Sequence, residues 1–310
     1  MYEITTTRHN HLVDSTLHAW SWQIPTYLFL GGLVAGMMLI SGYFLFKGRY
    51  KENNCSCYYL PLFSIVLLSL GMLFLFLDLE HKAYFWRLYT TFQITSPMSW
   101  GAWILILVYP ALILNILMRV PKPLINKIPK LKNLSDEFLK HPFGIKITGI
   151  INMILGGMVG MYTGILLSSL GARPLWSSAV LWLLFLVSGL SGAAAFVHLI
   201  AKNVYERELL AKADNGFLVI ELFVIAMLII GLLTSSKSHM AAALILLSGP
   251  FASSFWVFVL GLGIVIPLII QLLAVNHKIH HTPVAPIMVI LGGLILRFVI
   301  VAAGQYSHWF

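Results

Sequence analysis

The chain has 310 residues, of which 59% are hydrophobic and only 10% charged, and its mean hydropathy is +0.88. A water-soluble domain of this length cannot use so much apolar surface, so the composition excludes an ordinary soluble enzyme or binding module. Twenty Lys and Arg against eleven Asp and Glu give a net charge of +9. The positions of the basic residues along the chain distinguish a nucleic-acid-binding surface from the charge distribution of a membrane protein.

Eight apolar stretches are long enough to cross a membrane. About 20 apolar residues in a helix span a hydrocarbon core of about 30 Å, where lipid offers no partner to unpaired backbone groups. The sequence therefore predicts an all-α integral membrane protein. The expected spans, in chain order, are 23 to 46, 58 to 79, 99 to 119, 144 to 169, 176 to 200, 216 to 235, 251 to 275 and 284 to 304.

Three shorter features lie between or before these spans. The polar segment 1 to 22 lacks the charged and apolar regions of a cleavable signal peptide, so we expect the first span to act as its own insertion signal. The apolar piece 240 to 248 is too short to cross and predicts an interfacial or re-entrant helix. Cys55 and Cys57 are too few for a metal site, which needs about four ligands, so we expect incidental thiols.

The basic residues concentrate in alternate loops. Thirteen lie after the first, third, fifth and seventh spans, and five lie on the opposite side. Because cytoplasmic loops carry the Lys and Arg excess, this split predicts that both termini lie outside, on the side opposite the cytoplasm. The charge is then explained by topology, and we expect lipid and no nucleic acid as a partner. The thirteen are Lys47, Arg49, Lys51, Arg119, Lys122, Lys127, Lys130, Lys132, Lys140, Lys202, Arg207, Lys212 and Lys278; the five are Arg8, Lys82, Arg87, Arg173 and Lys237.

The loop from 121 to 142 is rich in Lys and Pro and divides the chain into nearly equal halves. It predicts two four-helix bundles. The expected division is a periplasmic segment 1 to 22, spans one to three in 23 to 119, a basic cytoplasmic loop 120 to 143, and spans four to eight in 144 to 310, with span four completing the first bundle.

An L-G-G pattern recurs at 30 to 32, 155 to 157 and 291 to 293. Small residues let membrane helices approach closely, so we favour a packing role for these glycines. An internal repeat is the alternative.

Polar side chains gather toward the outer ends of the spans. A helical rise of about 1.5 Å per residue places Asp78 and Tyr162 near the outer surface and Arg297 slightly beyond the midplane. Several further polar or aromatic residues belong to the same side, in the N-terminal segment, the start of the first span and the loop after the second span. They are His18, Trp20, Trp22, Gln23, Tyr27, Glu80, His81 and Arg87.

These residues have both structural and functional interpretations. A charge in hydrocarbon costs at least about 2.5 to 3.5 kcal/mol, so membrane ionisable groups usually pair or line a functional cavity. The structural alternatives are solvated span ends for Asp78 and Glu80, an interfacial aromatic belt for Tyr27 and the neighbouring tryptophans, and an ion pair for Arg297.

Two ionisable residues fall on the inner side. Glu221 is about five residues into the sixth span, and His198 is near the inner end of the fifth. They are either snorkelling interfacial residues or the beginning of a proton path from the cytoplasm. His198 is the only histidine at depth, so bis-histidine haem ligation is not expected. The sequence also has no cysteine set for an iron-sulfur cluster, no P-loop and no dinucleotide fingerprint.

Three segments in the first half resemble a known family. They are Leu77-Asp78-Leu79-Glu80, Phe85-Trp86-Arg87, and the T-S-P-M-S-W-G run from 95 to 101. Together they resemble the NrfD/PsrC family, the membrane subunits of polysulfide-reductase-like complexes, although Glu80 and His81 stand where many members have Gly-Arg. Supporting stretches are Y-L-F-L-G-G at 27 to 32, Y-T-G-I-L-L at 162 to 167, L-V-S-G-L-S at 186 to 191, and Gly304-Gln305.

The resemblance implies a subunit that binds a quinone, menaquinone in particular, near the outer membrane surface and carries no redox cofactor of its own. Electrons then pass between the quinone and a periplasmic four-cluster ferredoxin-like iron-sulfur subunit, coupled to a molybdopterin catalytic subunit. The expected half-reaction is quinol oxidation, and the chain is not expected to be catalytic alone.

This implied function assigns roles to the polar residues. Asp78, Glu80 and Tyr162 are the expected proton-exchanging residues. Imidazole, amide and phenol groups donate hydrogen bonds to carbonyls, so His18, Gln23, Tyr27 and Tyr162 are the expected quinone partners. Trp22 and Trp100 are expected to provide apolar walls, and Arg297 to hold the charge of an acidic neighbour. The alternatives are a proton- or ion-coupled transporter and a structural anchor without a quinone site.

Overall fold

The computed structural model describes residues 20–48, 59–118, 120–121, 125–126, 128–201, 204–276 and 282–309. These residues are mostly helical and form no strand. His18, Cys55 and Cys57, which the sequence singles out, lie outside the described residues.

Eight helices in this part of the chain are long and apolar enough to cross a membrane, which confirms the predicted all-α membrane fold. One of them, Ser254–Val275, begins as the π-helical segment η4 (Ser254–Val265) and continues as α11 (Ile266–Val275). The other seven are α1 (Gln23–Phe46), α2 (Leu60–Asp78), α4 (Pro97–Met118), α7 (Pro142–Ser168), α8 (Leu181–Ile200), α9 (Val204–Thr234) and α12 (Val284–Tyr306).

Between these helices, the described residues contain four short elements with assigned bounds. The 3-10 turn η3 (Lys82–Tyr84) and the short helix α3 (Arg87–Thr90) join α2 to α4. The predicted basic loop contains the helix α6 (Lys130–Leu139). The helix α10 (Lys237–Leu247) matches the short apolar helix expected at 240 to 248, and it starts earlier because Ser236 caps it by accepting a hydrogen bond from the His239 backbone N–H.

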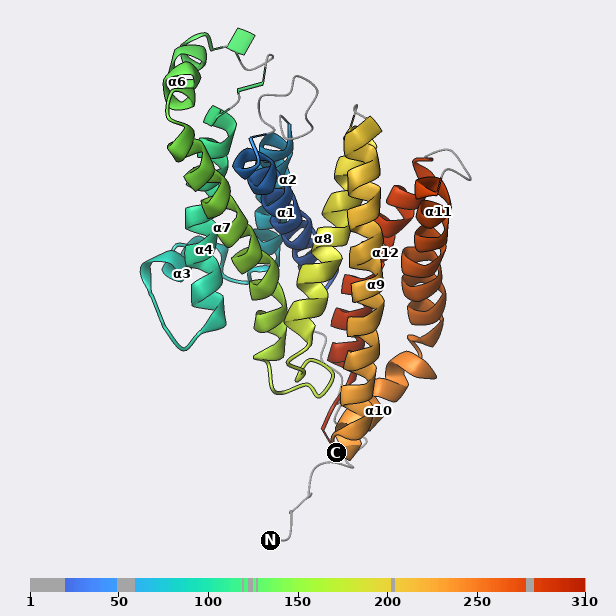
Figure 1. Cartoon of the computed structure of the whole chain (residues 1–310). Helices are drawn as coiled ribbons and strands as arrows, with labels where there is room; N and C mark the ends of the chain where they lie inside the picture. The colour runs from blue at the N-terminus through green and yellow to red at the C-terminus, as the bar shows by residue number, and fades with distance from the viewer. Residues whose placement is uncertain are drawn as a thin grey trace.

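The long helices run back and forth between two ends of the molecule (Figure 1). One end, here called the α6 end, carries α6. The opposite end, here called the terminal end, carries α10 and the C-terminus. Trp20 also lies there, because its backbone exchanges two hydrogen bonds of 2.9 Å with the side chain of Gln305. The assignment of the terminal end to the periplasm stays a prediction.

The helix α1 packs against α2, α7 and α8, and glycines allow its closest crossings. A Cβ atom on Gly189 of α8 would lie 2.5 Å from the carbonyl oxygen of Gly32. A Cβ atom on Gly156 of α7 would lie 2.8 Å from the carbonyl oxygen of Ala35. Gly292 of α12 meets Gly263 in the same way. Each L-G-G motif therefore supplies a glycine to a close helix crossing, as the packing interpretation expects. The grouping into two bundles stays a prediction, since α1 and α8 join the two halves.

Two predicted span boundaries need correction. The helix α8 begins at Leu181 rather than 176, because Trp176 turns back at the terminal end, where its ring stacks on Trp20 at 5.1 Å and its indole N–H donates to the Ile300 carbonyl at 3.0 Å. The helix α9 begins at Val204 rather than 216. Its first turns contain buried charged residues such as Asp214, which are covered by protein, so the loss of apolar character does not mark the helix start.

Candidate functional site

Two buried tyrosines meet near the terminal end. Tyr27 of α1 and Tyr162 of α7 form a hydrogen bond through their side chains. They are only 3% and 8% exposed. Tyr27 lies four residues from the start of α1 and Tyr162 six residues from the end of α7, so both are within about 6 to 9 Å of the helix ends. One phenol of such a pair donates and the other accepts, which leaves one hydroxyl proton for a ligand oxygen.

The ring of Tyr162 has room only because residue 101 is a glycine. A Cβ atom on Gly101 of α4 would overlap the outer atoms of the Tyr162 ring. Gly101 is the last residue of the T-S-P-M-S-W-G run. At the end of this run, α4 packs against the tyrosine pair. A residue larger than glycine at position 101 would collide with the Tyr162 ring.

A third tyrosine joins the pair from the loop between α2 and α4. Tyr89 of α3 is half-buried and interacts electrostatically with both Tyr27 and Tyr162. Burial raises the pKa of the Tyr89 phenol, so it stays protonated and able to donate a hydrogen bond at neutral pH. Tyr27, Tyr89 and Tyr162 together are called the tyrosine site below.

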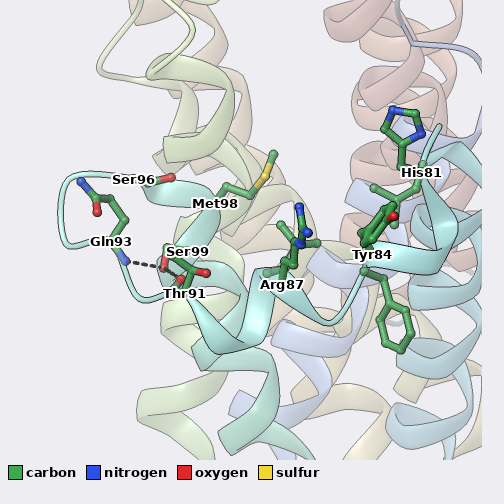
Figure 2. A pocket seen from close by; sticks show the side chains of 11 residues that line it. His81, Tyr84, Arg87, Thr91, Gln93, Ser96, Met98 and Ser99 are labelled. Carbon is green, nitrogen blue, oxygen red and sulfur yellow. Dashed lines mark hydrogen bonds between the residues drawn. The ribbon is translucent and has the colours of Figure 1, made fainter.

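A cavity of about 430 Å³ lies in the same loop. Figure 2 shows His81 and Tyr84 on one side of it and Met98 on the other, with Arg87 between them. The guanidinium of Arg87 stacks over the Tyr84 ring at 4.5 Å. The remaining lining residues are Leu79, Phe85, Leu88, Thr91, Gln93, Ser96 and Ser99. We call this cavity the loop pocket. It adjoins the tyrosine site in sequence, because its lining residue Leu88 directly precedes Tyr89.

The loop pocket has an ordered polar rim. The Gln93 backbone N–H donates to the Ser99 hydroxyl at 3.0 Å (Figure 2), and the Ser99 side chain is buried. Trp100 does not line this pocket. It is 41% exposed, and its indole N–H donates to the Ile94 carbonyl at 2.6 Å, which fastens the loop. Two hydrogen bonds, from Gln93 to Ser99 and from Trp100 to Ile94, therefore tie the loop to the start of α4.

The other residues expected at the outer site are spread around this centre. Asp78 is the half-buried last residue of α2, and Glu80 is exposed in the loop. Trp22 is 51% exposed and packs edge-on against Phe74 at 5.3 Å. Gln23 has a buried side-chain oxygen that lacks a hydrogen-bond partner among the described residues. Of the predicted set, the structure thus joins Tyr27 and Tyr162 directly.

Arg297 lies elsewhere, among α8, α9 and α12. Its Nη2 donates to the Phe185 carbonyl at 2.8 Å, and the guanidinium lies 4.0 Å from the centre of the Phe185 ring. Its acidic neighbour is Glu221, which also forms a hydrogen bond with Ser188. None of these contacts involves the tyrosine site. Glu221 is therefore well inside the protein, seventeen residues after the start of α9, and not near the inner surface as predicted from a span starting at 216.

A second buried carboxylate extends this group. Asp214 is fully buried and accepts hydrogen bonds from Ser191 at 2.6 Å and from the Gln271 amide at 2.7 Å. It lies seven residues before Glu221, which is two turns along the same face of α9. We call Asp214, Glu221 and Arg297, with the side chains that bond them, the charged cluster.

His198 lies at the α6 end of the same helices. It is 5% exposed and lines a cavity of about 220 Å³ together with Leu199, Arg207, Thr282, Pro283 and Pro286. His198 and Ser191 are seven residues apart on α8, so they share a helix face. This places His198 on the side of α8 that leads toward Asp214.

Tyr89 and Asp214 belong to these two groups but are not among the residues predicted from the sequence. No sequence pattern places Tyr89, because a loop residue reaches the tyrosine pair only through the fold of the loop. Asp214 has a readable signal, its seven-residue spacing from Glu221. A span that starts at 216 hides that signal, because it leaves Asp214 outside the helix.

The eight apolar spans of the described residues define a multi-pass membrane protein. A family model described as polysulphide reductase, NrfD, matches residues 9–307, and the chain belongs to this family. The spans and the family together indicate a protein of the bacterial inner membrane.

Three relatives are similar over almost their whole length. The C subunit of the polysulfide reductase of Wolinella succinogenes is 29% identical over 92% of this chain and 94% of its own. The NrfD homolog of Haemophilus influenzae is 31% identical, and the NrfD protein of Escherichia coli 28% identical, each over 93% of this chain and 95% of its own.

Proposed function

We propose that the chain is the quinone-binding membrane subunit of a respiratory reductase complex and that the tyrosine site holds the quinone ring. The hydrogen-bonded Tyr27–Tyr162 pair carries this proposal, because a buried phenol pair leaves a proton for a ligand carbonyl. The name of the Wolinella relative, which makes it one subunit of a polysulfide reductase, supports a role beside other reductase subunits.

The residues present suit a quinone. When bound, menaquinone would supply the two-electron, two-proton redox chemistry that this chain lacks. Tyr162 would donate to one ring oxygen, with Tyr27 fixing the orientation of its hydroxyl, and Gly101 leaves the space that the ring of Tyr162 needs. The unpartnered oxygen of Gln23, at the start of α1, remains a candidate second contact.

The loop between α2 and α4 would connect this site to the partner subunits. We propose that an iron-sulfur subunit, itself bound to a molybdopterin subunit, docks over the loop pocket on the periplasmic side. Asp78 and Glu80 lie at the edge of this loop, where a carboxylate can pass protons to water. His81 and Arg87, which line the pocket, would face the docked partner.

We further propose that the charged cluster and His198 form a proton path from the α6 end. His198 borders a cavity at this end, Asp214 lies further in, and Glu221 lies beyond it beside Arg297. Two acids and one base are buried together, so one carboxylate has no cation to balance it and is able to take up a proton.

Two substitutions test the quinone proposal in the assembled complex. Tyr162→Phe and Asp78→Asn should each lower quinol-linked electron transfer at least about tenfold, since both remove a proton-exchanging group. Asp136→Asn, on α6 at the opposite end, is the matched control and should leave turnover unchanged. Unchanged turnover in both site variants, with assembly intact, would sink the assignment.

One observation favours a second candidate, a proton- or ion-coupled transporter. The charged cluster is buried, and the hydrogen bonds of Asp214 and Arg297 go to no residue of the tyrosine site. Such a transporter would move protons or ions in liposomes without quinol. Glu221→Gln would stop that flux, whereas in the proposed subunit it changes only quinol-driven proton movement.

A further inference from the structure

A second cavity opens beside the tyrosine site, between α2 and α4. It has a volume of about 250 Å³ and is lined by Met72, Tyr89, Leu105, Ile106 and Tyr109. Apart from two phenols, this lining is apolar. Ile106 is 39% exposed on the outer surface of the helices, so the cavity opens sideways, where lipid would lie.

The depth of this cavity suits the half of the bilayer nearest the terminal end. Met72 is six residues from the end of α2, and Tyr109 is twelve residues from the start of α4, which corresponds to about 9 to 18 Å from those helix ends. A hydrogen bond of 3.2 Å between Ser69 and Tyr109 joins α2 to α4 at the deep edge of the opening. The cavity is therefore bounded on its midplane side and continues toward the terminal end.

Tyr89 connects the cavity with the tyrosine site. It lines the cavity together with Tyr109 and lies near Tyr27 and Tyr162. Leu105, which also lines the cavity, is one turn along α4 from Gly101, where an added Cβ atom would overlap the Tyr162 ring. The neighbouring Leu88 lines the loop pocket instead. The short helix α3 thus separates a lipid-facing cavity from a cavity at the end of the molecule.

We propose that the opening between α2 and α4 is the lateral entrance through which an isoprenoid quinone reaches the tyrosine site from the bilayer. Its tail would remain between Met72, Leu105 and Ile106. This inference rests on the proposed quinone function and adds the route and the tail contacts. An apolar tail gains free energy from an apolar groove that a tail-less quinone does not use.

The test compares menaquinone-4, which has an isoprenoid tail, with menadione, which has none. The full-length chain in nanodiscs is equilibrated with each quinone, and the retained quinone is extracted and quantified by chromatography. Ile106→Trp fills the mouth of the opening from an exposed position. Met72→Trp fills it from α2 and guards against a variant that fails to fold.

Both variants should weaken retention of menaquinone-4 by about tenfold, the loss expected when about two buried methylene groups of the tail lose their contacts, while menadione binds as before. Ile154→Trp is the matched control. It places the same ring at a 58% exposed position in another lipid-facing groove, lined by Leu107, Pro110 and Ile151, and should change neither quinone.

The outcomes separate the two proposals. If both filling variants retain menaquinone-4 and menadione as well as wild type does, the lateral entrance is overturned and the quinone site itself is not affected. Wild-type chain that retains neither quinone would overturn the proposed function itself.

Discussion

The tyrosine site and the charged cluster differ in the charge of their side chains and in how far protein encloses them. The tyrosine site uses neutral hydroxyl groups and lies beside two cavities, one in a loop and one facing lipid. The charged cluster uses two carboxylates and a guanidinium, all at most 4% exposed, and its groups are mostly held by side-chain or backbone hydrogen bonds. Neutral donors tolerate an apolar opening, whereas charges at depth need enclosure.

This difference suggests a division of labour. A ligand from the bilayer can approach Tyr162 without crossing a charged surface. In the proposed proton path, a proton from the α6 end would reach Glu221 by way of His198 and Asp214. The two regions meet where α1 crosses α8, since Gly32 touches Gly189 and a Cβ atom on Gly32 would lie 3.4 Å from Nη2 of Arg297. Changes at one region should therefore leave the other intact unless they disturb this crossing.

The largest effect should come from breaking the pair that Arg297 forms with Glu221. Arg297→Met leaves Glu221 buried without its cation and should lower the free energy of unfolding by about 3 to 5 kcal/mol. Adding Glu221→Gln should recover most of this loss. Reversible unfolding in mixed detergent micelles measures both. If the double variant is as unstable as the two single losses added together, the pair does not interact.

A smaller effect should come from the crossing that joins the two regions. Gly189→Ala places a Cβ atom 2.5 Å from the Gly32 carbonyl oxygen, so α1 and α8 must separate, at a cost of about 1 to 3 kcal/mol. This variant should weaken quinone retention and stability together. Gly157→Ala is the control, since nothing lies within 4 Å of the added atom. Equal behaviour of the two variants would mean that the crossing tolerates extra volume.

Gly101→Ala should affect only the tyrosine site. The added methyl group displaces the Tyr162 ring. Quinone retention should fall about tenfold, which corresponds to about 1.4 kcal/mol, near the lower end of the cost of overpacking. Gly216→Ala, in open space on α9, is the control. Retention equal to wild type in Gly101→Ala would show that the position of Tyr162 is not critical.

The smallest effect should come from the terminal end. Gln305→Ala removes both hydrogen bonds to the Trp20 backbone and should cost about 1 to 2 kcal/mol of stability. Quinone retention should not change, because neither residue belongs to the tyrosine site. A fall in retention without a fall in thermal stability would instead place the N-terminal segment in the ligand site.

Much of the fold could be predicted because the membrane imposes simple rules. Span number follows from apolar length alone, and the structure has all eight predicted spans. The boundaries failed where protein rather than lipid surrounds the chain. At α9 the helix continues through Asp214, which Ser191 and Gln271 stabilise, and no apolar count detects that. At α8 the helix begins later than predicted, at Leu181, because Trp176 stacks on Trp20 before the helix starts.

The candidate site was predictable only in part. Helical depth placed Tyr27 and Tyr162 at similar levels, and the structure brings them together. Depth does not specify which way a side chain faces, so Arg297 was grouped with residues that it does not contact. Tyr89 depends on the path of a loop, which depth and periodicity do not determine. The identity of the ligand comes from family resemblance and remains a proposal.

The central claim is that a quinone binds at Tyr162, and a titration of the purified full-length chain with menadione tests it most directly. Wild type should bind saturably, and Tyr162→Phe should weaken binding by about tenfold, as expected for one buried hydrogen bond to a ligand. Tyr306→Phe, which alters a 46% exposed tyrosine at the end of α12, should bind like wild type. No saturable binding in wild type, or equal affinity in wild type and Tyr162→Phe, would contradict the claim.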